Sequence, residues 1–259
     1  MPKTRHKTIA LFAAGICLVG NVPVMAARFL ESTVDDPIVS GKTCDVHQPV
    51  SYGSYIYAKP SKYDLVFWPL TSEKWVWHCK QSGFTAFGGD FEITDKERRD
   101  IRDYLASAYD GEADVVHRLR LLEGIYELRE KDEHFRNLML RVLARKYQEL
   151  GYIERANEYR LIAWTGIKEL LLTDLELPAK LEYLFIAANY ARQVGDRAAS
   201  DEYLRNLTNT IDQLSLADND RHENLEGQAN FLLKLAADTA LITPGGRLEP
   251  DQDVRIEEP

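Results

Sequence analysis

The stretch ARKYQELGYIERANEY at residues 144–159 decides the fold, because a related stretch, ANYARQVGDRAASDEY, follows at residues 188–203. The two align on their glycines at a spacing of 44 residues, and five positions match. The matched pairs are Ala144 and Ala188, Leu150 and Val194, Gly151 and Gly195, Glu158 and Glu202, and Tyr159 and Tyr203. Small residues where helices cross, a glycine at the turn and an aromatic residue on the second helix are typical of a helix–turn–helix unit. The sequence therefore predicts two such units in succession.

These units resemble the tetratricopeptide repeat, although that repeat has a period of about 34 residues. The longer spacing implies extended helices or an extra turn around residues 171–178. Ordinary amphipathic helices can also produce some of the matches, and a solenoid usually needs three or more repeats. We expect a tetratricopeptide-like helical hairpin array, with unrelated amphipathic helices as the alternative.

Helical periodicity extends outward from the repeat in both directions. Thr94-Asp95-Lys96-Glu97 has the pattern of a capping box and predicts a helix that runs to about Tyr109. Further helices are expected near residues 113–129, 133–149, 152–171, 178–194, 197–214 and 222–241. Trp164 with Leu161, Ile167 and Leu171 falls at helical spacing, which is most often the mark of a core face. Residues 93–242 are therefore expected to form one helical domain.

Residues 43–92 have a different composition, because eight aromatic residues lie between Tyr52 and Trp77. Gly53, Pro60 and Pro69 punctuate the same stretch. Aromatic enrichment with short alternations and turn clusters favours short strands. We therefore expect a mainly α protein with a small β-rich aromatic head at residues 43–92.

Residues 1–26 have the layout of a secretory signal peptide, with a basic start, an apolar run from Ile9 to Gly20 and small residues before a cleavage point after Ala26. The alternative is a retained membrane anchor, but the run of about 12 residues is short of the roughly 20 that span a bilayer. Ile16 precedes Cys17, where a lipoprotein would have a small residue, so we expect no lipidation. The sequence predicts a periplasmic or secreted protein without stable membrane insertion after cleavage.

Cleavage would remove three cations and no acid, so the formal net charge of −9 would become about −12. Such a charge repels nucleic acid and anionic lipid surfaces, and we expect neither as a partner. Residues 27–42 read as a flexible polar leader, and residues 243–259 as a disordered acidic tail. Both flanks are therefore expected to lie outside the folded domains.

Export would leave only Cys44 and Cys79, and two cysteines in an oxidising compartment predict a disulfide before a metal site. Around them, the segments TCDVH at 43–47, WVWHCKQSGF at 75–84 and DFE at 90–92 resemble a bacterial family of unknown function. In that family, a zinc-ribbon-like head with two C-x-x-C knuckles precedes tetratricopeptide-like helices. The resemblance implies that this head descends from a zinc-binding module.

The departures from that pattern leave three outcomes open for the head. The first knuckle reads Cys44-x-x-His47 and the second Cys79-x-x-Ser82, so two of the four thiolates are missing. A zinc site could be made of Cys44, His47, His78 and Cys79. However, His78 and Cys79 would then have to bind the same ion, although neighbours on a strand point to opposite faces. We expect no cofactor and a Cys44–Cys79 disulfide, with zinc or two unpaired buried thiols as alternatives.

No assembled catalytic motif occurs in the sequence, which contains no G-x-S-x-G, no phosphate loop and no dinucleotide-binding glycine pattern. The hypothesis is therefore a non-catalytic protein-binding or scaffolding protein of the bacterial envelope, with a protein or peptide partner. The alternative is a metal-binding protein or enzyme whose site lies between head and helices. Aromatic residues with His47, His78, Asp64 and Asp90 would line that cleft.

Overall fold

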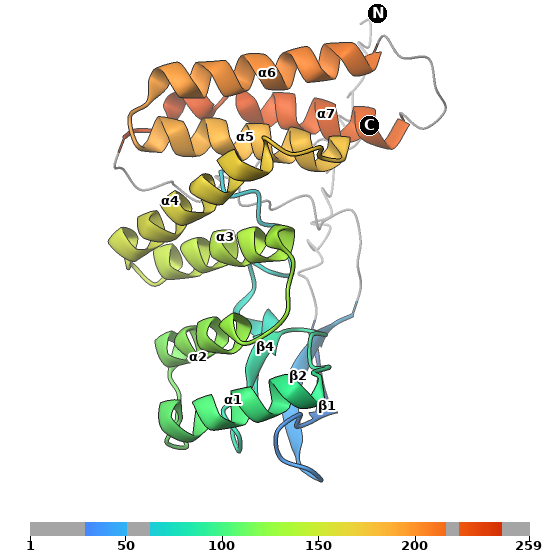
Figure 1. The fold of residues 1–259 in the computed structure, drawn as a ribbon, viewed down its shortest axis with the longest axis vertical. Coiled ribbons are helices and arrows are strands. Elements are labelled where there is room, and N and C mark those ends of the chain that lie inside the picture. The colour runs from blue at the N-terminus through green and yellow to red at the C-terminus, as the bar shows by residue number, and fades with distance from the viewer. Residues whose placement is uncertain (1–28, 51–62, 216–222, 245–259) are drawn as a thin grey trace, which may run out of the picture.

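A computed structural model describes residues 29–50, 63–215 and 223–244. It is mainly helical, with a small β head at one end and the later helices stacked away from it along the longest axis (Figure 1). This arrangement confirms the expected fold class. The predicted signal peptide at residues 1–26 and all of the tail beyond Pro244 lie outside the described residues.

Two short antiparallel sheets form the head. Strand β1 (Phe29–Asp35) pairs with β2 (Thr43–Pro49), and β3 (Val76–His78) pairs with β4 (Thr85–Phe87). A short 3-10 helix, η2 (Glu73–Trp75), directly precedes β3. Cys44 in β2 lies opposite Val34 in β1, and the two strands pair along their whole length.

The prediction of a flexible leader at residues 27–42 is wrong for its described part, because residues 29–35 form β1. Only Phe29, Ser32 and Val34 of this strand are partly buried, so its sequence shows little of the apolar alternation that predicts a strand. Instead, backbone hydrogen bonds to β2 hold it. The Asp36 carboxylate then accepts hydrogen bonds from the Ile38 and Val39 amides, at 2.8 and 3.1 Å, and fixes the turn that follows.

The helices begin and end close to the expected residues. In α1, the predicted capping box is present: Thr94 Oγ1 accepts from the Glu97 amide and the Glu97 carboxylate accepts from the Thr94 amide. The helices are α1 (Asp95–Ala108), α2 (Val115–Glu127), α3 (Glu133–Glu149), α4 (Ile153–Leu170), α5 (Leu177–Gln193), α6 (Arg197–Ser215) and α7 (Glu223–Ala236), followed by the 3-10 helix η3 (Thr239–Leu241). Pro178 lies in the first turn of α5, as expected.

Helices α3 and α4 form one hairpin, and α5 and α6 form a second hairpin offset by 44 residues. Their turns use the same backbone hydrogen bonds at that offset. The Gly151 amide donates to the Gln148 carbonyl at 3.0 Å, and the Gly195 amide donates to the Arg192 carbonyl at 3.0 Å. Both glycines have positive φ, +86° and +88°, a conformation that other residues rarely adopt.

A stretch of chain rich in turns, residues 63–72, runs from the helices to the head; we call it the crossing segment (Figure 1). Two adjacent residues of this segment point into different hydrophobic cores. Val66 is buried with head, α1 and α2 residues, whereas Leu65 is buried with residues of α4, α5, α6 and α7. Leu65 has φ +48°, which an L-residue with a side chain adopts at a cost of about 1–2 kcal/mol. The crossing segment thus joins the two cores at one turn.

Asp64 anchors the crossing segment in the helical core. Arg160 donates from Nε and Nη2 to the two carboxylate oxygens, both at 2.7 Å, and Tyr190 Oη donates to Oδ1 at 2.8 Å. The side chains of Asp64 and Arg160 are only 2% and 1% exposed. Burial by itself would raise the pKa of Asp64, but the Arg160 charge and these hydrogen bonds hold that pKa below its usual value. The pair is therefore ionised inside the fold.

Replacing one partner of this pair should destabilise the protein strongly, because the other charge is left buried. For Asp64→Asn we expect a loss of about 3–5 kcal/mol in the free energy of unfolding, measured by urea denaturation at pH 7. The double variant Asp64→Leu with Arg160→Met should recover most of that loss, since it removes both charges. A matched surface control is Glu130→Gln, which breaks the exposed pair with Lys96 and should cost less than about 1 kcal/mol. Equal losses for Asp64→Asn and Glu130→Gln would contradict the anchoring role.

Candidate functional site

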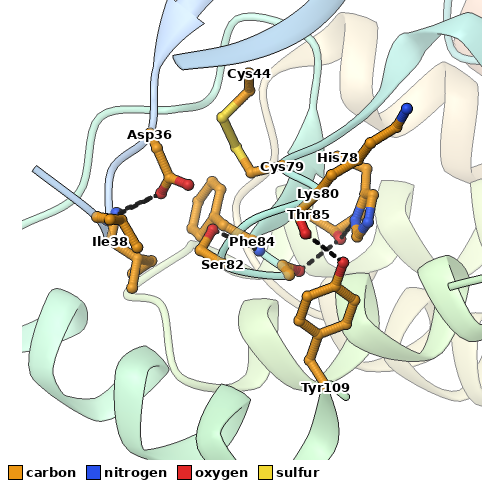
Figure 2. Close-up of a disulfide and its surroundings, with 12 residues drawn as sticks. Asp36, Ile38, Cys44, His78, Cys79, Lys80, Ser82, Phe84, Thr85 and Tyr109 are labelled. Carbon is orange, nitrogen blue, oxygen red and sulfur yellow. Dashed lines mark hydrogen bonds between the residues drawn. A yellow bond between two sulfur atoms is a disulfide. The ribbon is translucent and has the colours of Figure 1, made fainter. Parts of the chain in front are cut away.

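The predicted disulfide is present in the head. Cys44 lies in β2 and Cys79 directly follows β3, and their Cα atoms are 4.8 Å apart. The bridge closes a loop with a sequence separation of 35 residues that contains the whole crossing segment. Both cysteines are buried, and Phe84 and Ser82 lie beside the bridge (Figure 2). The disulfide therefore fixes both ends of the loop that reaches the helices.

The four residues of the alternative zinc set do not come together. His78 turns away from the bridge, and its Nδ1 lies 2.8 Å from Thr85 Oγ1 (Figure 2). His78 and Cys79 thus point to opposite sides of the chain, as expected from the sequence for neighbours on a strand. The residue that does approach the two sulfurs is Asp36, with ligand atoms within 4.8 Å of one another. The sequence offered no signal for Asp36, since the strand and turn that bring it there were unexpected.

His78 faces a hollow of about 660 Å³ between the head and the loop that joins α1 to α2. Tyr109 and His117 also line it, and the Tyr109 hydroxyl donates to the Lys80 carbonyl at 2.6 Å. Burial, together with the nearby charges of Arg118, His117 and Lys80, lowers the pKa of His78 to about 4. His78 is therefore neutral at physiological pH.

Hydrogen bonds fix which nitrogen of each imidazole carries the proton. The Thr85 hydroxyl donates to the Gly83 carbonyl at 2.9 Å, so it accepts from His78 Nδ1 and leaves His78 Nε2 unprotonated. His117 Nε2 lies 2.9 Å from the Ala108 carbonyl, which can only accept, so His117 Nε2 carries a proton and donates it. The hollow is thus lined by a neutral His78 whose Nε2 is unprotonated and by His117, whose ring is fixed by its hydrogen bond to the Ala108 carbonyl.

Of the four polar residues expected to line one cleft, two share a hollow and two do not. His47 and His78 line a second hollow of about 400 Å³ beside Trp77, whose indole donates to the His47 carbonyl at 3.0 Å. Asp64 is enclosed in the helical core with Arg160. Asp90 is bound by other groups: it forms ion pairs with Arg129 and Lys131, each at 2.9 Å, and accepts from Tyr126 at 2.8 Å. The predicted cleft is therefore only partly assembled.

The crossing segment occupies one face of the helical hairpins. Side chains of the hairpins bind its main-chain carbonyls. Arg141 Nη1 donates to the carbonyls of Asp64 and Leu65, at 3.0 and 3.1 Å. Lys146 Nζ donates to the Thr71 carbonyl at 2.8 Å, and Asn189 Nδ2 to the Tyr63 carbonyl at 3.3 Å. The donors come from α3 and α5, the first helix of each hairpin. The hairpins thus already hold a segment of the chain through its main-chain carbonyls.

A further hollow of about 460 Å³ lies between α4 and α5; we call it the α4–α5 groove. Its walls include Leu161, Val194 and Trp164, and Glu154 and Glu158 lie at it. The expectation that Leu161 belongs to the core is wrong, because its side chain is 51% exposed, whereas Trp164 and Ile167 are buried as expected. The buried stripe of α4 contains Arg160 instead. A helix that buries an arginine and exposes a leucine is misread by apolar periodicity alone.

Removing the disulfide should destabilise the head. The chain-entropy account gives about 3–4 kcal/mol for a loop of this length, and native disulfides in small domains are usually worth about 2–5 kcal/mol. We expect the double variant Cys44→Ser with Cys79→Ser to lose an amount in this range, measured by urea unfolding. Denatured, unreduced wild-type protein should have an intact mass 2 Da below the thiol form and take up no alkylating reagent at these positions. Two alkylated thiols with one bound zinc per chain would contradict the disulfide.

His78 should make stability depend on pH between its unfolded and folded pKa values. The unfolded chain binds a proton near pH 6.5, whereas the folded chain binds it only near pH 4. Between these values the unfolded state holds more protons, so stability is complete above pH 6.5 and falls as the pH falls toward 4. We expect His78→Gln to flatten this part of the profile, measured by thermal unfolding from pH 7 to 4.5. Parallel profiles for variant and wild type would contradict it.

Comparison with known proteins found no family model, no curated protein and no solved structure that matches this chain. The resemblance of the head to zinc-ribbon-like modules therefore stays a prediction.

Proposed function

We propose that this chain is an exported, non-catalytic protein-binding or scaffolding protein of the bacterial envelope. Export is supported by the signal-peptide pattern of residues 1–26 and by the Cys44–Cys79 disulfide, since such bridges persist in oxidising compartments. No helix in the described ranges is long and apolar enough to cross a membrane. In this proposal the mature chain acts in the periplasm or outside the cell.

The observation that carries the binding proposal is the way in which the hairpins hold the crossing segment. Arg141, Lys146 and Asn189 bind main-chain carbonyls, which every peptide offers whatever its sequence. Specificity comes from one side chain, Asp64, enclosed by Arg160 and Tyr190. Arrays of helical hairpins in which each unit contacts its neighbours present extended surfaces to partner chains. We regard the two equivalent hairpins as a tetratricopeptide-like array that uses this chemistry for a partner as well as for itself.

The partner is a protein or peptide. The net charge of −9, which export would make more negative, disfavours nucleic acid, which proteins usually bind through a basic surface. Large apolar side chains on the outer surface of α4 favour a protein partner, because Leu161 and Ile162 are 51% and 54% exposed.

Site-specific crosslinking tests the binding proposal. A photoreactive amino acid at Leu161 in α4 or at Glu226 in α7 should give discrete adducts with the same protein in the cells that make the chain. Both positions are exposed, so the substitution should preserve the fold. The matched control is Lys96, an exposed position on α1, which should give no such adduct. If neither array position gives an adduct while the chain is exported and folded, the binding proposal fails.

The second candidate function is metal binding between the head and the helices, with zinc as the expected ion. It is favoured by the ring hydrogen bonds of His78 and His117, which line the same hollow, because a ligating imidazole usually donates its other ring N–H to a protein acceptor. Titration of the full chain with Zn²⁺ would support this candidate if His78→Gln removed stoichiometric binding. Binding that is absent, or unchanged by His78→Gln, would exclude this pair as the ligands.

A further inference from the structure

We propose that the α4–α5 groove is the docking site for the partner, and that the partner presents a large apolar side chain flanked by lysine or arginine. The inference rests on the proposed binding function and assigns it a place and a chemistry. It does not depend on the face that the crossing segment occupies, since none of residues 63–72 lines this groove. The groove is therefore available to a second chain while the crossing segment is bound.

The walls of the groove suit one large apolar side chain. Leu161 on α4 and Val194 at the end of α5 both line the groove and are 51% and 52% exposed. Trp164 also lines the groove and is 9% exposed. Burying exposed aliphatic surface is favourable, so a partner side chain that covers both residues binds more tightly because it removes them from water. The walls thus select for an apolar group.

The charges at the groove are negative. Glu154 and Glu158 are exposed acids one helical turn apart on α4, where both line the groove. Among the lining residues the only cation is Arg160, and its charge is already matched by Asp64 inside the core. Lys168, farther along α4, lies over the Trp164 ring at 4.4 Å. Two acids without a lining counter-charge favour a cationic flank on the partner, and the net charge of the chain adds long-range attraction.

The base of the groove is held in place before any partner arrives. Asn157 Oδ1 accepts from Arg160 Nη1 at 3.1 Å and from Gln193 Nε2 at 2.5 Å, which links α4 to α5. Arg160 Nη2 also donates to Gln148 at 2.6 Å. Because these side chains are already ordered, binding costs little further conformational entropy on this side of the interface.

The chain's own C-terminal tail is the competing occupant. Pro244, the last described residue, lies near Gly195, which follows Val194 in the chain. However, that tail contains five acids and only two arginines. Its net negative charge is repelled by Glu154 and Glu158, so a cationic partner in trans fits the groove better than the tail.

The test uses the full mature chain and two synthetic decapeptides, each with two leucines flanked by two lysines or by two glutamates. We expect the lysine peptide to bind at least tenfold more tightly than the glutamate peptide in fluorescence anisotropy at low salt, and this preference to shrink as salt is added. Leu161→Glu should weaken lysine-peptide binding at least tenfold. The matched control is Leu172→Glu at an 88% exposed leucine that does not line the groove, and it should bind as wild type does.

Two further variants separate this inference from the proposed function. Glu154→Gln with Glu158→Gln should reduce the preference for the lysine peptide several-fold, and removal of residues 245–259 should leave it unchanged. The inference is overturned if the peptides bind equally, if neither binds, or if Leu161→Glu and Leu172→Glu behave alike. It is also overturned if removing the tail is needed for binding, since the tail then occupies the groove. Crosslinks to a partner from Glu226 alone would keep the proposed function and reject this site.

Discussion

The buried ion pair between Asp64 and Arg160 is the interaction on which the arrangement of head and helices depends. Two opposite charges inside a protein each cost several kcal/mol to desolvate, and only close pairing with further hydrogen bonds repays this. Here both carboxylate oxygens are bound by Arg160, and Tyr190 adds a third hydrogen bond. Asp64 comes from the loop that the disulfide closes, and Arg160 comes from α4. The pair can therefore form only when this loop lies in one position on the helices. It therefore specifies how the loop sits on the helices.

The disulfide complements this pair, because it joins the two ends of the loop that contains Asp64. Cys44 and Cys79 close the loop in the head, while Asp64, in its interior, is fixed in the helical core. Neither constraint alone would order the loop, because a closed loop can still move as a whole and a single anchor leaves its ends free. Together they allow Leu65 and Val66 to pack into different cores. The positive φ of Leu65 is tolerated because Arg141 binds the carbonyls on both sides of that turn.

The sequence predicted the features that local patterns determine. Three predictions of this kind agree with the structure: the capping box at Thr94, the helix ends near residues 149 and 193, and the cysteine pairing. The first two depend on neighbouring residues, and the third depends on simple elimination. Strand β1 and the crossing segment could not be predicted, because their stability comes from partners distant in the chain. Arg160 shows the same limit within a helix. Its place in a buried stripe follows from Asp64, 96 positions earlier, and no periodicity within α4 reveals it.

Arg160 also connects stability to binding, because it belongs to the core on one side and lines the α4–α5 groove on the other. If its charge were not matched by Asp64, the groove would contain a cation beside Glu154 and Glu158, and its preference for a cationic partner would be largely cancelled. The anchor of the crossing segment therefore has two consequences. It fixes the loop on the inner side of α4, and it leaves the outer side with an uncompensated negative charge. A chain that keeps Arg160 but lacks Asp64 would therefore differ in partner preference as well as in stability.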